Sequence, residues 1–385
     1  YSTALTDTEL AHFERFLQGG KVHFQTVATT PYGEAVTTAI AFDARARQKS
    51  ARNEFQATGG SLYYLKHQDV LDDSLQVDIE VRDLITGNVL DSNTLVPVVD
   101  YELDASAGRI IFAHPVDRYV DSGLLTSADL DSGNLVYVVT HYNYAIIDDY
   151  QKGISGGRVK QAVTDNISLG VTHATEDKDA GKYRLSAADV TVQFNEHAKV
   201  TFEYAQTQSL GIDRHVSIDG GLNWAIDDAP TLADQILAED QSGRAWSAKG
   251  DASFMDERIN MNYYYREVGD TFSANATRHQ LGKKGAGFDI SAGISAATSL
   301  RYKRDSQWQM DGGSVEAGFQ LRGNQENHTD IVQVTHNLER LTLTGEYRSQ
   351  RLTPLNTALP AFTPMQDSEL FAGQATYQFN QTTQL

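Results

Sequence analysis

The sequence predicts an all-β protein, in which a short N-terminal helix and a β-sandwich module precede an antiparallel β-barrel of the outer-membrane type. Three observations lead to this prediction. Apolar and polar residues alternate over most of the second half of the chain, as they do in strands with one apolar and one polar face. Short polar turns and longer connections join these segments. The composition, with 30 Gly, 18 Tyr and only seven Pro, suits a chain of many strands and turns.

Residues 1–20 are expected to form a helical linker. Residues 6–9 (Thr-Asp-Thr-Glu) have the composition of a helix start, with a capping side chain and acid in the first turn. Gly19 and Gly20 would end the helix. The apolar residues between these signals recur at helical spacing: Leu10, Phe13, Phe16 and Leu17. The segment shows no catalytic pattern.

Residues 21–145 are expected to form the β-sandwich module. Short alternating segments recur there at a spacing of roughly 8–12 residues, with turns that contain Gly, which is typical of a small sandwich. The hairpin at residues 21–42 has an alternative placement. It could be the first hairpin of the barrel, with the module inserted after it.

A series of motifs in this module resembles a known family. The motifs are Ala51-Arg52-Asn53-Glu54-Phe55, Gly59-Gly60-Ser61-Leu62-Tyr63-Tyr64-Leu65, Ile79-Glu80-Val81-Arg82-Asp83, Asp100-Tyr101-Glu102-Leu103 and Gly108-Arg109-Ile110-Ile111-Phe112. They resemble the repeated β-module of large bacterial surface and outer-membrane proteins, a poorly characterised family. In that family the module stands beside repeat domains or a barrel. The resemblance therefore implies a location at the cell surface or outer membrane and no particular activity.

Residues 146–385 are expected to be barrel hairpins, and residues 183–204 show the pattern most clearly. The apolar face of this hairpin carries Ala188, Val190, Val192, Phe194, Val200, Phe202 and Tyr204. Polar residues such as Asp189, Thr191 and Glu203 occupy the alternate positions. We expect about thirteen such strands of roughly ten residues each, the length of a tilted strand that spans a membrane.

Three features favour a lipid-facing sheet over a water-soluble one. Aromatic residues lie near the ends of the apolar faces, as in an interfacial girdle. The opposite faces carry charges of both signs, such as Lys249 and Asp251, as a wet lumen would. Small residues such as Gly250 and Gly345 lie on the apolar faces. The alternative is a secreted adhesin or surface-layer β-array without membrane insertion, because a soluble sandwich has the same period.

Composition excludes several classes of function. The net charge of −19 and the pI near 4.9 argue against nucleic acid as a partner, which requires a basic surface. The chain has no Cys, so disulfides and thiolate metal sites are impossible. It also has no run of 18 apolar residues, as a transmembrane helix requires.

The sequence contains no motif for a cofactor, a metal or catalysis. The eleven His are scattered without metal-ligand spacing, and no nucleophile elbow or phosphate-binding loop follows a strand. Acidic residues at 176–179 and 213–234 leave open a structural or lipopolysaccharide-bridging divalent cation, although acidic loops are usually only solvated. We therefore expect a protein that is not an enzyme.

Residues 208–242 are predicted to form an exposed loop on the long-loop rim, where partner or ligand contacts concentrate. Loops of this length are usually functional or disordered. A short helix is expected at residues 233–237, after Pro230. The loop mixes acidic and apolar residues, and the candidate contact residues are Trp224, Asp227, Asp228 and Asp234. The alternative is a loop that folds over its own barrel mouth and contacts nothing else.

The expected function is that of a pore, anchor or scaffold in the outer membrane of a Gram-negative bacterium, with the module on the periplasmic or the surface side. The expected partners are outer-membrane lipid and proteins bound at the long-loop rim. Residues 377–385 resemble a short turn that opens into another strand. We therefore expect the barrel hairpins to continue beyond residue 385.

Overall fold

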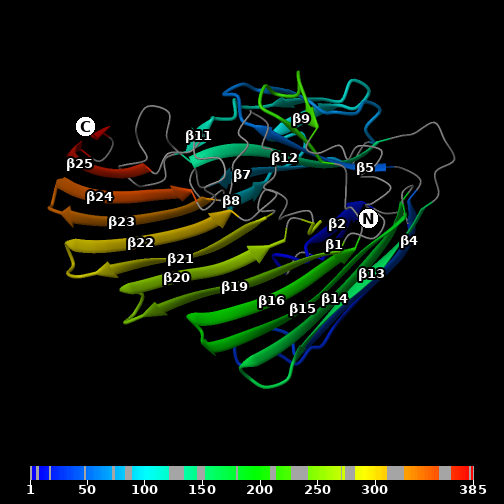
Figure 1. Ribbon diagram of the computed structural model, residues 1–385, viewed down its shortest axis with the longest axis horizontal. Helices are drawn as coiled ribbons and strands as arrows, with labels where there is room; N and C mark the ends of the chain where they lie inside the picture. The colour runs from blue at the N-terminus through cyan, green and yellow to red at the C-terminus, as the bar shows by residue number, and fades with distance from the viewer. Residues whose placement is uncertain are drawn as a thin grey trace.

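The computed structural model contains only strands, turns and bends among the residues it describes. These are residues 2–5, 8–16, 19–46, 49–71, 74–82, 89–120, 134–144, 152–178, 181–208, 214–226, 242–269, 271–273, 282–309, 325–354, 366–380 and 383–384. Within these ranges no helix is long and apolar enough to cross a membrane. The expected all-β class is confirmed (Figure 1).

The largest element is a fourteen-stranded sheet in which every neighbouring pair is antiparallel. Its strands are β3 (Gly19–Gln25), β4 (Thr37–Ala46), β13 (Lys152–Ala162), β14 (Ile167–Lys178), β15 (Gly181–Asn195), β16 (Ala198–Gln208), β19 (Ser242–Phe254), β20 (Ile259–Val268), β21 (Lys283–Gly293), β22 (Thr298–Gln309), β23 (Gln325–Asn337), β24 (Leu341–Pro354), β25 (Gln366–Asn380) and β26 (Thr383–Gln384). β4 pairs with β13, so the residue 21–42 hairpin belongs to this sheet and the module is inserted after it.

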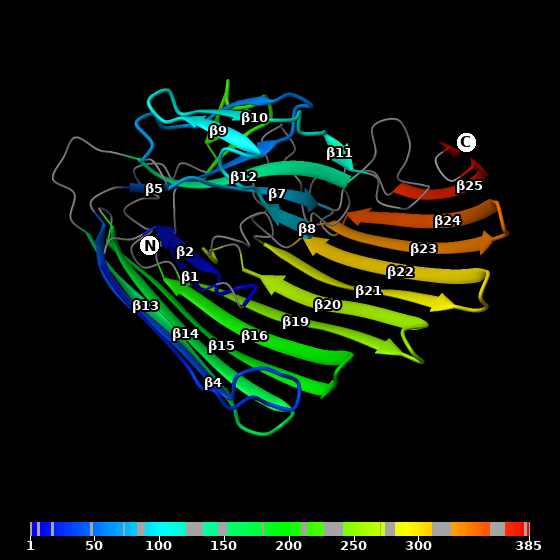
Figure 2. The same ribbon diagram turned by 180° about the vertical axis from the view of Figure 1, so that it is seen from behind.

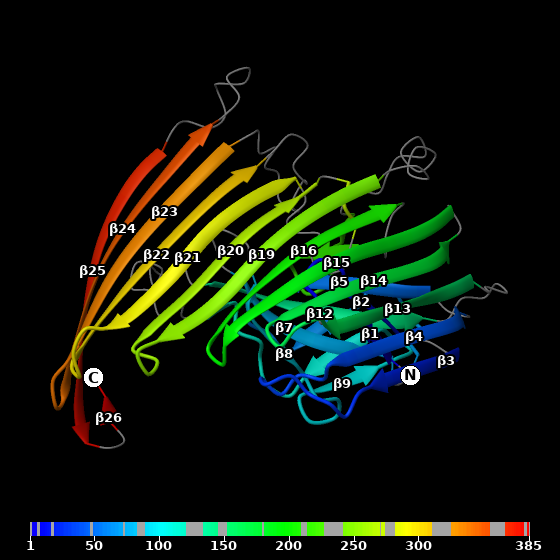
Figure 3. The same ribbon diagram turned by 90° about the horizontal axis from the view of Figure 1, so that it is seen from below.

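The sheet does not close into a barrel within the described residues. Its strand order runs from β26 to β3, and these two strands form its edges. The sequence predicted barrel hairpins that belong to a larger barrel and continue beyond residue 385, and the described residues form a curved open sheet (Figure 3). In the described part of the chain, twelve strands of this sheet follow residue 146, close to the number of about thirteen expected there, and β3 and β4 come from before the module.

The two rims of the sheet differ in their connections. Short turns join β13 to β14, β15 to β16, β19 to β20, β21 to β22 and β23 to β24 at one rim, which we call the short-turn rim. The opposite rim carries the module and the connections at residues 209–241, 269–282, 310–324 and 355–365. We call it the long-connection rim. Two connections depart from this rule: residues 26–36 join β3 to β4 at the short-turn rim, and residues 179–180 join β14 to β15 at the long-connection rim. The middle connections, which looked short at both rims in the sequence, follow the rule.

The module consists of two sheets around one core. Its strands are β5 (Lys49–Gln56), β6 (Leu62–Tyr64), β7 (Gln76–Arg82), β8 (Val89–Thr94), β9 (Tyr101–Asp104), β10 (Arg109–Phe112), β11 (Tyr119–Val120) and β12 (Asn134–Tyr144). β6, β10 and β9 form one sheet, and β5, β12, β7 and β8 belong to the other. Phe55, Tyr63 and Phe112 are buried between the sheets, with edge-to-face ring contacts.

A buried ion cluster lies on the other face of the β5–β12–β7 layer. Glu54 is 1% exposed and accepts hydrogen bonds from Arg52 Nε at 2.8 Å and Arg82 Nη1 at 3.0 Å. Arg82 Nη2 also donates to Glu80 Oε2 at 2.6 Å. Burial lowers the pKa of Arg82, but the carboxylates of Glu54 and Glu80 outweigh burial and hold it above its usual value. In Figures 1 and 2 this layer lies between the β9–β10 sheet and the large sheet.

The segment at residues 214–226 ties the module to the large sheet. β17 (Arg214–Ser217) pairs in parallel with β5, and β18 (Ala225–Ile226) pairs with β17. Gly221 has φ 93° and lies against the carbonyl oxygen of Tyr64, so the position has no room for a Cβ. The prediction of one exposed loop over residues 208–242 is therefore wrong for residues 214–226, which extend the module sheet.

The N-terminal residues form a hairpin, and the predicted N-terminal helix is wrong. β1 (Ser2–Leu5) and β2 (Phe13–Phe16) pair only with each other in the described part of the chain. Leu10 and Phe13 do share a buried environment, as their spacing suggested. They reach it through a bend at residues 8–11 whose backbone N–H groups bond to a side chain of the large sheet, which replaces the bonds of a helix.

Candidate functional site

The large sheet has two chemically different faces, because successive side chains of a strand point to opposite sides. The N-terminal hairpin packs on one of them, which we call the covered face. The other, the bare face, carries exposed apolar side chains. The covered face is the candidate functional site, since it holds a cavity, a set of ion pairs and a segment from elsewhere in the chain.

The covered face divides into two zones along the strands. Near the long-connection rim it is apolar, and its buried residues are Phe42, Ala44, Ile154, Ala174, Leu185, Ala187, Ala205, Ala245 and Val268. Toward the short-turn rim it is polar, with Arg158, Lys160, Asp189, Thr191, Lys199, Thr201, Glu203, Ser247 and Lys249. The same strands supply both zones, so the change in character occurs along each strand.

The N-terminal segment lies at the boundary between the zones. Leu10 is fully buried, and the Phe13 ring stacks on Phe42 with centroids 5.8 Å apart. Leu5 is 1% exposed in the same cluster. Burial of side chains of this size contributes about 1.5–3 kcal/mol each. Apolar packing therefore provides most of the attraction between the hairpin and the sheet.

Glu203 binds the backbone of this segment. Its Oε2 atom accepts hydrogen bonds from the N–H groups of Glu9 and Leu10, both at 2.9 Å, and its Oε1 accepts one from Ala11 at 2.8 Å. Three consecutive N–H groups that converge on an anion form a nest, which recognises backbone shape and not side-chain identity. Glu203 is 5% exposed, so these bonds also satisfy a carboxylate that is removed from water.

The Glu9 side chain provides the complementary contact. Its carboxylate forms ion pairs with Arg266 and with Lys249 Nζ, the latter at 3.7 Å. Ser247 Oγ donates a hydrogen bond to Glu9 Oε2 at 3.2 Å. The segment thus presents an acid to two cations of the sheet while the sheet presents an acid to the backbone of the segment.

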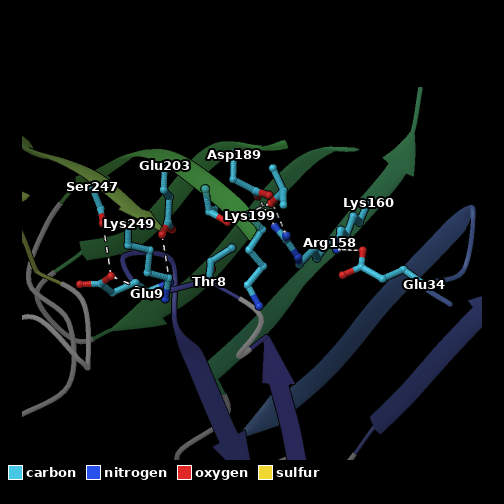
Figure 4. Close-up of a pocket in the computed structure, with 12 residues that line it drawn as sticks. Thr8, Glu9, Glu34, Arg158, Lys160, Asp189, Lys199, Glu203, Ser247 and Lys249 are labelled. Carbon is cyan, nitrogen blue, oxygen red and sulfur yellow. Dashed lines mark hydrogen bonds and ion pairs between the residues drawn. The ribbon is translucent and has the colours of Figure 1, made fainter. Parts of the chain in front are cut away.

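A cavity of about 210 Å³ adjoins the bend on the side of the short-turn rim (Figure 4). Thr8 and Glu9 form one wall, Glu34 of the β3–β4 connection lies at the edge, and the polar zone of the covered face forms the rest. Lys160 and Glu34 are paired at 2.6 Å at its edge. The cavity is therefore the part of the polar zone that the N-terminal segment leaves open to water.

A buried ion pair lies at the base of this cavity. Arg158 Nη1 donates to Asp189 Oδ1 at 2.6 Å and to Thr172 Oγ1 at 2.9 Å, and Arg158 Nη2 donates to Asp189 Oδ2 at 3.1 Å. The two charged side chains are 4% and 3% exposed. Gly170 makes room for the pair, because a Cβ there would overlap Asp189 and lie 2.7 Å from Arg158 Nη2.

Ion pairs continue along the covered face beyond the N-terminal segment. Arg301 pairs with Asp289 at 2.6 Å between β22 and β21. Asp305 pairs with Lys303 at 3.2 Å and accepts a hydrogen bond from Tyr264 Oη at 3.0 Å. Charged groups of both signs are typical of a surface that faces water or a polar solute. They do not identify a particular solute.

The bare face carries an apolar run in each of several strands. In β19 the run begins at Trp246 and ends at Phe254, and in β25 it begins at Phe371 and ends at Phe379. These four rings are between 48% and 79% exposed. The positions that follow Trp246 and Phe371 on this face toward the long-connection rim are charged: Arg244 and Glu369.

The length of these runs fits a bilayer. Both runs span eight residue steps, which is about 27 Å along an antiparallel strand. A tilt of about 40° reduces this to roughly 21 Å along the membrane normal, close to the apolar band of about 25 Å on transmembrane barrels. Aromatic rings close both ends of each run, and small residues such as Gly250 and Gly373 lie between them.

The structure places one of the sequence-predicted contact residues. The Trp224 ring packs on Phe55 in the module, with centroids 5.2 Å apart. Nearby, the Asp219 carboxylate accepts hydrogen bonds from Asn223, which lower its pKa. The other three predicted contact residues lie outside the described residues: Asp227, Asp228 and Asp234. The helix expected at residues 233–237 also lies outside them. That partner contacts concentrate in residues 208–242 stays a prediction.

Sequence reasoning missed Glu9, Arg158 and Glu203 as site residues. Asp189 and Glu203 were placed on the polar face of their hairpin, but alternation alone could not show what they contact. Glu9 was assigned to the first turn of a helix. No group of three or more His, Asp or Glu in the described part of the chain could hold a metal ion.

Comparisons with known proteins give only weak likenesses. No protein-family profile matches the chain, and no curated protein sequence matches it. Among solved structures, the FrpB iron transporter from Neisseria meningitidis (F3-3 variant) is 11% identical with a TM-score of 0.32, over 72% of this chain and 48% of FrpB. OpdL from Pseudomonas aeruginosa is 9% identical with a TM-score of 0.24, over 92% of this chain and 94% of OpdL.

Both neighbours are outer-membrane β-barrel proteins. This chain spans about half the length of FrpB. TM-scores this low show no shared fold in detail.

Proposed function

We propose that the chain is an outer-membrane β-protein whose bare face contacts lipid and whose covered face lines an aqueous passage. The observation that carries this proposal is the difference between the faces. One has exposed aromatic rings at both ends of apolar runs of membrane-spanning length. The other has paired charges, a polar cavity and its own N-terminal segment.

The proposal includes a closed barrel around the passage. In hydrocarbon, an unpaired strand edge leaves backbone N–H and C=O groups without partners, at a cost of several kcal/mol each. Within the described residues β3 and β26 are the two ends of the strand order, and β3 is exposed along its whole length. In the membrane both edges of the sheet must therefore be paired, which completes the barrel. No step of the proposed function is catalytic.

The rims suggest how the protein is oriented. Outer-membrane barrels have short turns on the periplasmic side and longer loops on the outer side. The module is inserted between β4 and β13 at the long-connection rim, and residues 214–226 bind it there. In our proposal the module is therefore on the cell surface, over the outer mouth of the passage, where partner proteins would meet it.

Single-cysteine labelling tests the proposed location, because the natural chain has no Cys. Ala107 lies in an exposed turn of the module, and Glu196 lies in an exposed turn of the short-turn rim. In intact cells, a membrane-impermeant maleimide should label Ala107→Cys and leave Glu196→Cys unlabelled. Glu196→Cys should become reactive when the outer membrane is permeabilised.

Two controls complete this experiment. Both variants should fractionate with outer membranes and should react fully after solubilisation in detergent. Labelling of Glu196→Cys and not Ala107→Cys in intact cells would reverse the proposed orientation. Recovery of the protein as a soluble monomer would contradict membrane insertion and favour the secreted β-array.

A further inference from the structure

The N-terminal segment occupies its place on the covered face without any strand pairing to the large sheet. In the described residues β1 and β2 hydrogen-bond only to each other as strands, and β3 begins the large sheet after them. Apolar packing and the contacts of Glu9 and Glu203 provide the attachment. Such an attachment can be released without breaking the sheet.

The contacts that hold the segment have the features of a peptide-binding site. Glu203 binds three consecutive backbone N–H groups. Any bent peptide can make this contact unless one of the three positions is Pro, which has no N–H. Lys249, Arg266 and Ser247 bind an acidic side chain at the first of these three positions. The apolar zone beside them takes a Leu at the second position.

We propose that the covered face contains a binding site for a bent peptide with an acidic residue followed by an apolar one. Residues 8–13 of the chain fill this site as a displaceable plug. A peptide of the same chemistry competes for the site when the plug is released. Release of the plug also opens the passage, and this part of the proposal rests on the proposed function. Recognition of the peptide does not depend on it.

Charge complementarity supports this occupant over a small solute. The cavity beside the plug is lined by cations and acids in comparable number, and several of these are paired with each other. An ion or sugar phosphate would find no excess of one sign there. The row of three N–H donors that binds Glu203 is supplied by polypeptide backbone, which a small ion or sugar phosphate lacks.

The test uses the full-length chain in detergent, so that it does not depend on lipid. Glu9→Lys places a cation against Lys249 and Arg266 and should release the plug. Hydrogen exchange at the amides of residues 9–11 should then rise at least ten-fold, while the amides of β16 stay protected. A fluorescent peptide with the sequence of residues 2–16 should bind this variant saturably, at least ten-fold tighter than it binds the native chain.

Three controls separate recognition from adhesion. Glu34→Lys changes another glutamate of the same cavity that is paired with a lysine, and it should not create a peptide site. Adding Glu203→Gln to Glu9→Lys should weaken peptide binding at least ten-fold. A peptide of the same composition in scrambled order should not bind.

Several results would overturn the proposal. Unchanged exchange at residues 9–11 in Glu9→Lys would show that the segment is a fixed part of the core. Equal binding of the native and scrambled peptides, or binding that survives Glu203→Gln, would show that no specific site exists. Cysteine labelling in intact cells reports on the membrane location alone, so a failure of the proposed function remains distinguishable from a failure of this site.

Discussion

Replacing Phe202 by Arg is expected to destabilise the membrane-inserted protein by about 2–4 kcal/mol, if the position lies near the bilayer midplane. Phe202 is 52% exposed on the bare face, between Val200 and Tyr204 on the same face of β16. In a soluble protein, a change at so exposed a site usually stays within about 0.5 kcal/mol. The large effect is expected only because lipid replaces water on this face. Urea titration of the protein folded into vesicles would measure it.

The neighbouring residue provides the matched control. Thr201 lies on the covered face, where its Oγ1 is 3.2 Å from that of Thr191 at the wall of the cavity. Thr201→Arg should therefore cost much less than Phe202→Arg. Leu343→Arg and Thr342→Arg form a second pair with the same expectation, since Leu343 is 42% exposed on the bare face. Equal costs within both pairs would mean that the bare face does not contact lipid.

Replacing Asp189 by Asn is expected to cost about 3–5 kcal/mol, since it leaves the buried guanidinium of Arg158 without its counter-ion. The pair is almost completely buried and has bidentate geometry. A buried cation that loses its carboxylate keeps its desolvation cost and loses the attraction that offset it. Denaturant unfolding of the single variant against the native chain measures the loss.

The double variant Arg158→Leu/Asp189→Leu should recover much of that loss, because an apolar pair of similar volume removes both desolvation costs. Gly170→Ala should also destabilise the protein, since its Cβ would enter the space of the pair. If Asp189→Asn is neutral while the double variant is strongly destabilised, water reaches this part of the covered face and the pair is not buried.

The periodicity of the sequence was sufficient to predict the large sheet and the chemistry of its faces. A strand has a fixed period of two, so Val190 and Asp189 had to lie on opposite faces wherever the hairpin was placed. The resemblance of the module's motifs to a known family stays a prediction, because no protein-family profile matches the chain. The module's insertion after β4 followed only from pairing of β4 with β13, which are separated by more than 100 residues of sequence.

The candidate site could not be predicted in this way, because it depends on contacts between distant segments. Glu9 and Glu203 are almost 200 residues apart, and neither stands in a motif for a binding site. The spacing of Leu10 and Phe13 fits a helix, but a sheet that offers an apolar zone and a carboxylate stabilises a bend and a hairpin in its place. Tertiary contacts thus overrode local preference.

Residues 208–242 show the same limit. Their length and polar composition are typical of an exposed loop. The parallel pairing of β17 with β5 and the contact of Trp224 with Phe55 could not be read from composition. Trp224 was predicted as a contact residue for a partner or ligand, and the structure shows its ring packed on Phe55 in the module of its own chain.

Fluorescence of Trp246 tests most directly whether the bare face contacts lipid. Trp246 is 53% exposed on that face, whereas Trp224 packs in the module. In a variant that keeps Trp246 alone, phospholipids brominated near the headgroup should quench the emission, and iodide in the water should not. A variant with Trp224 alone should be insensitive to the brominated lipid. Quenching of Trp246 by iodide and not by brominated lipid would contradict the account.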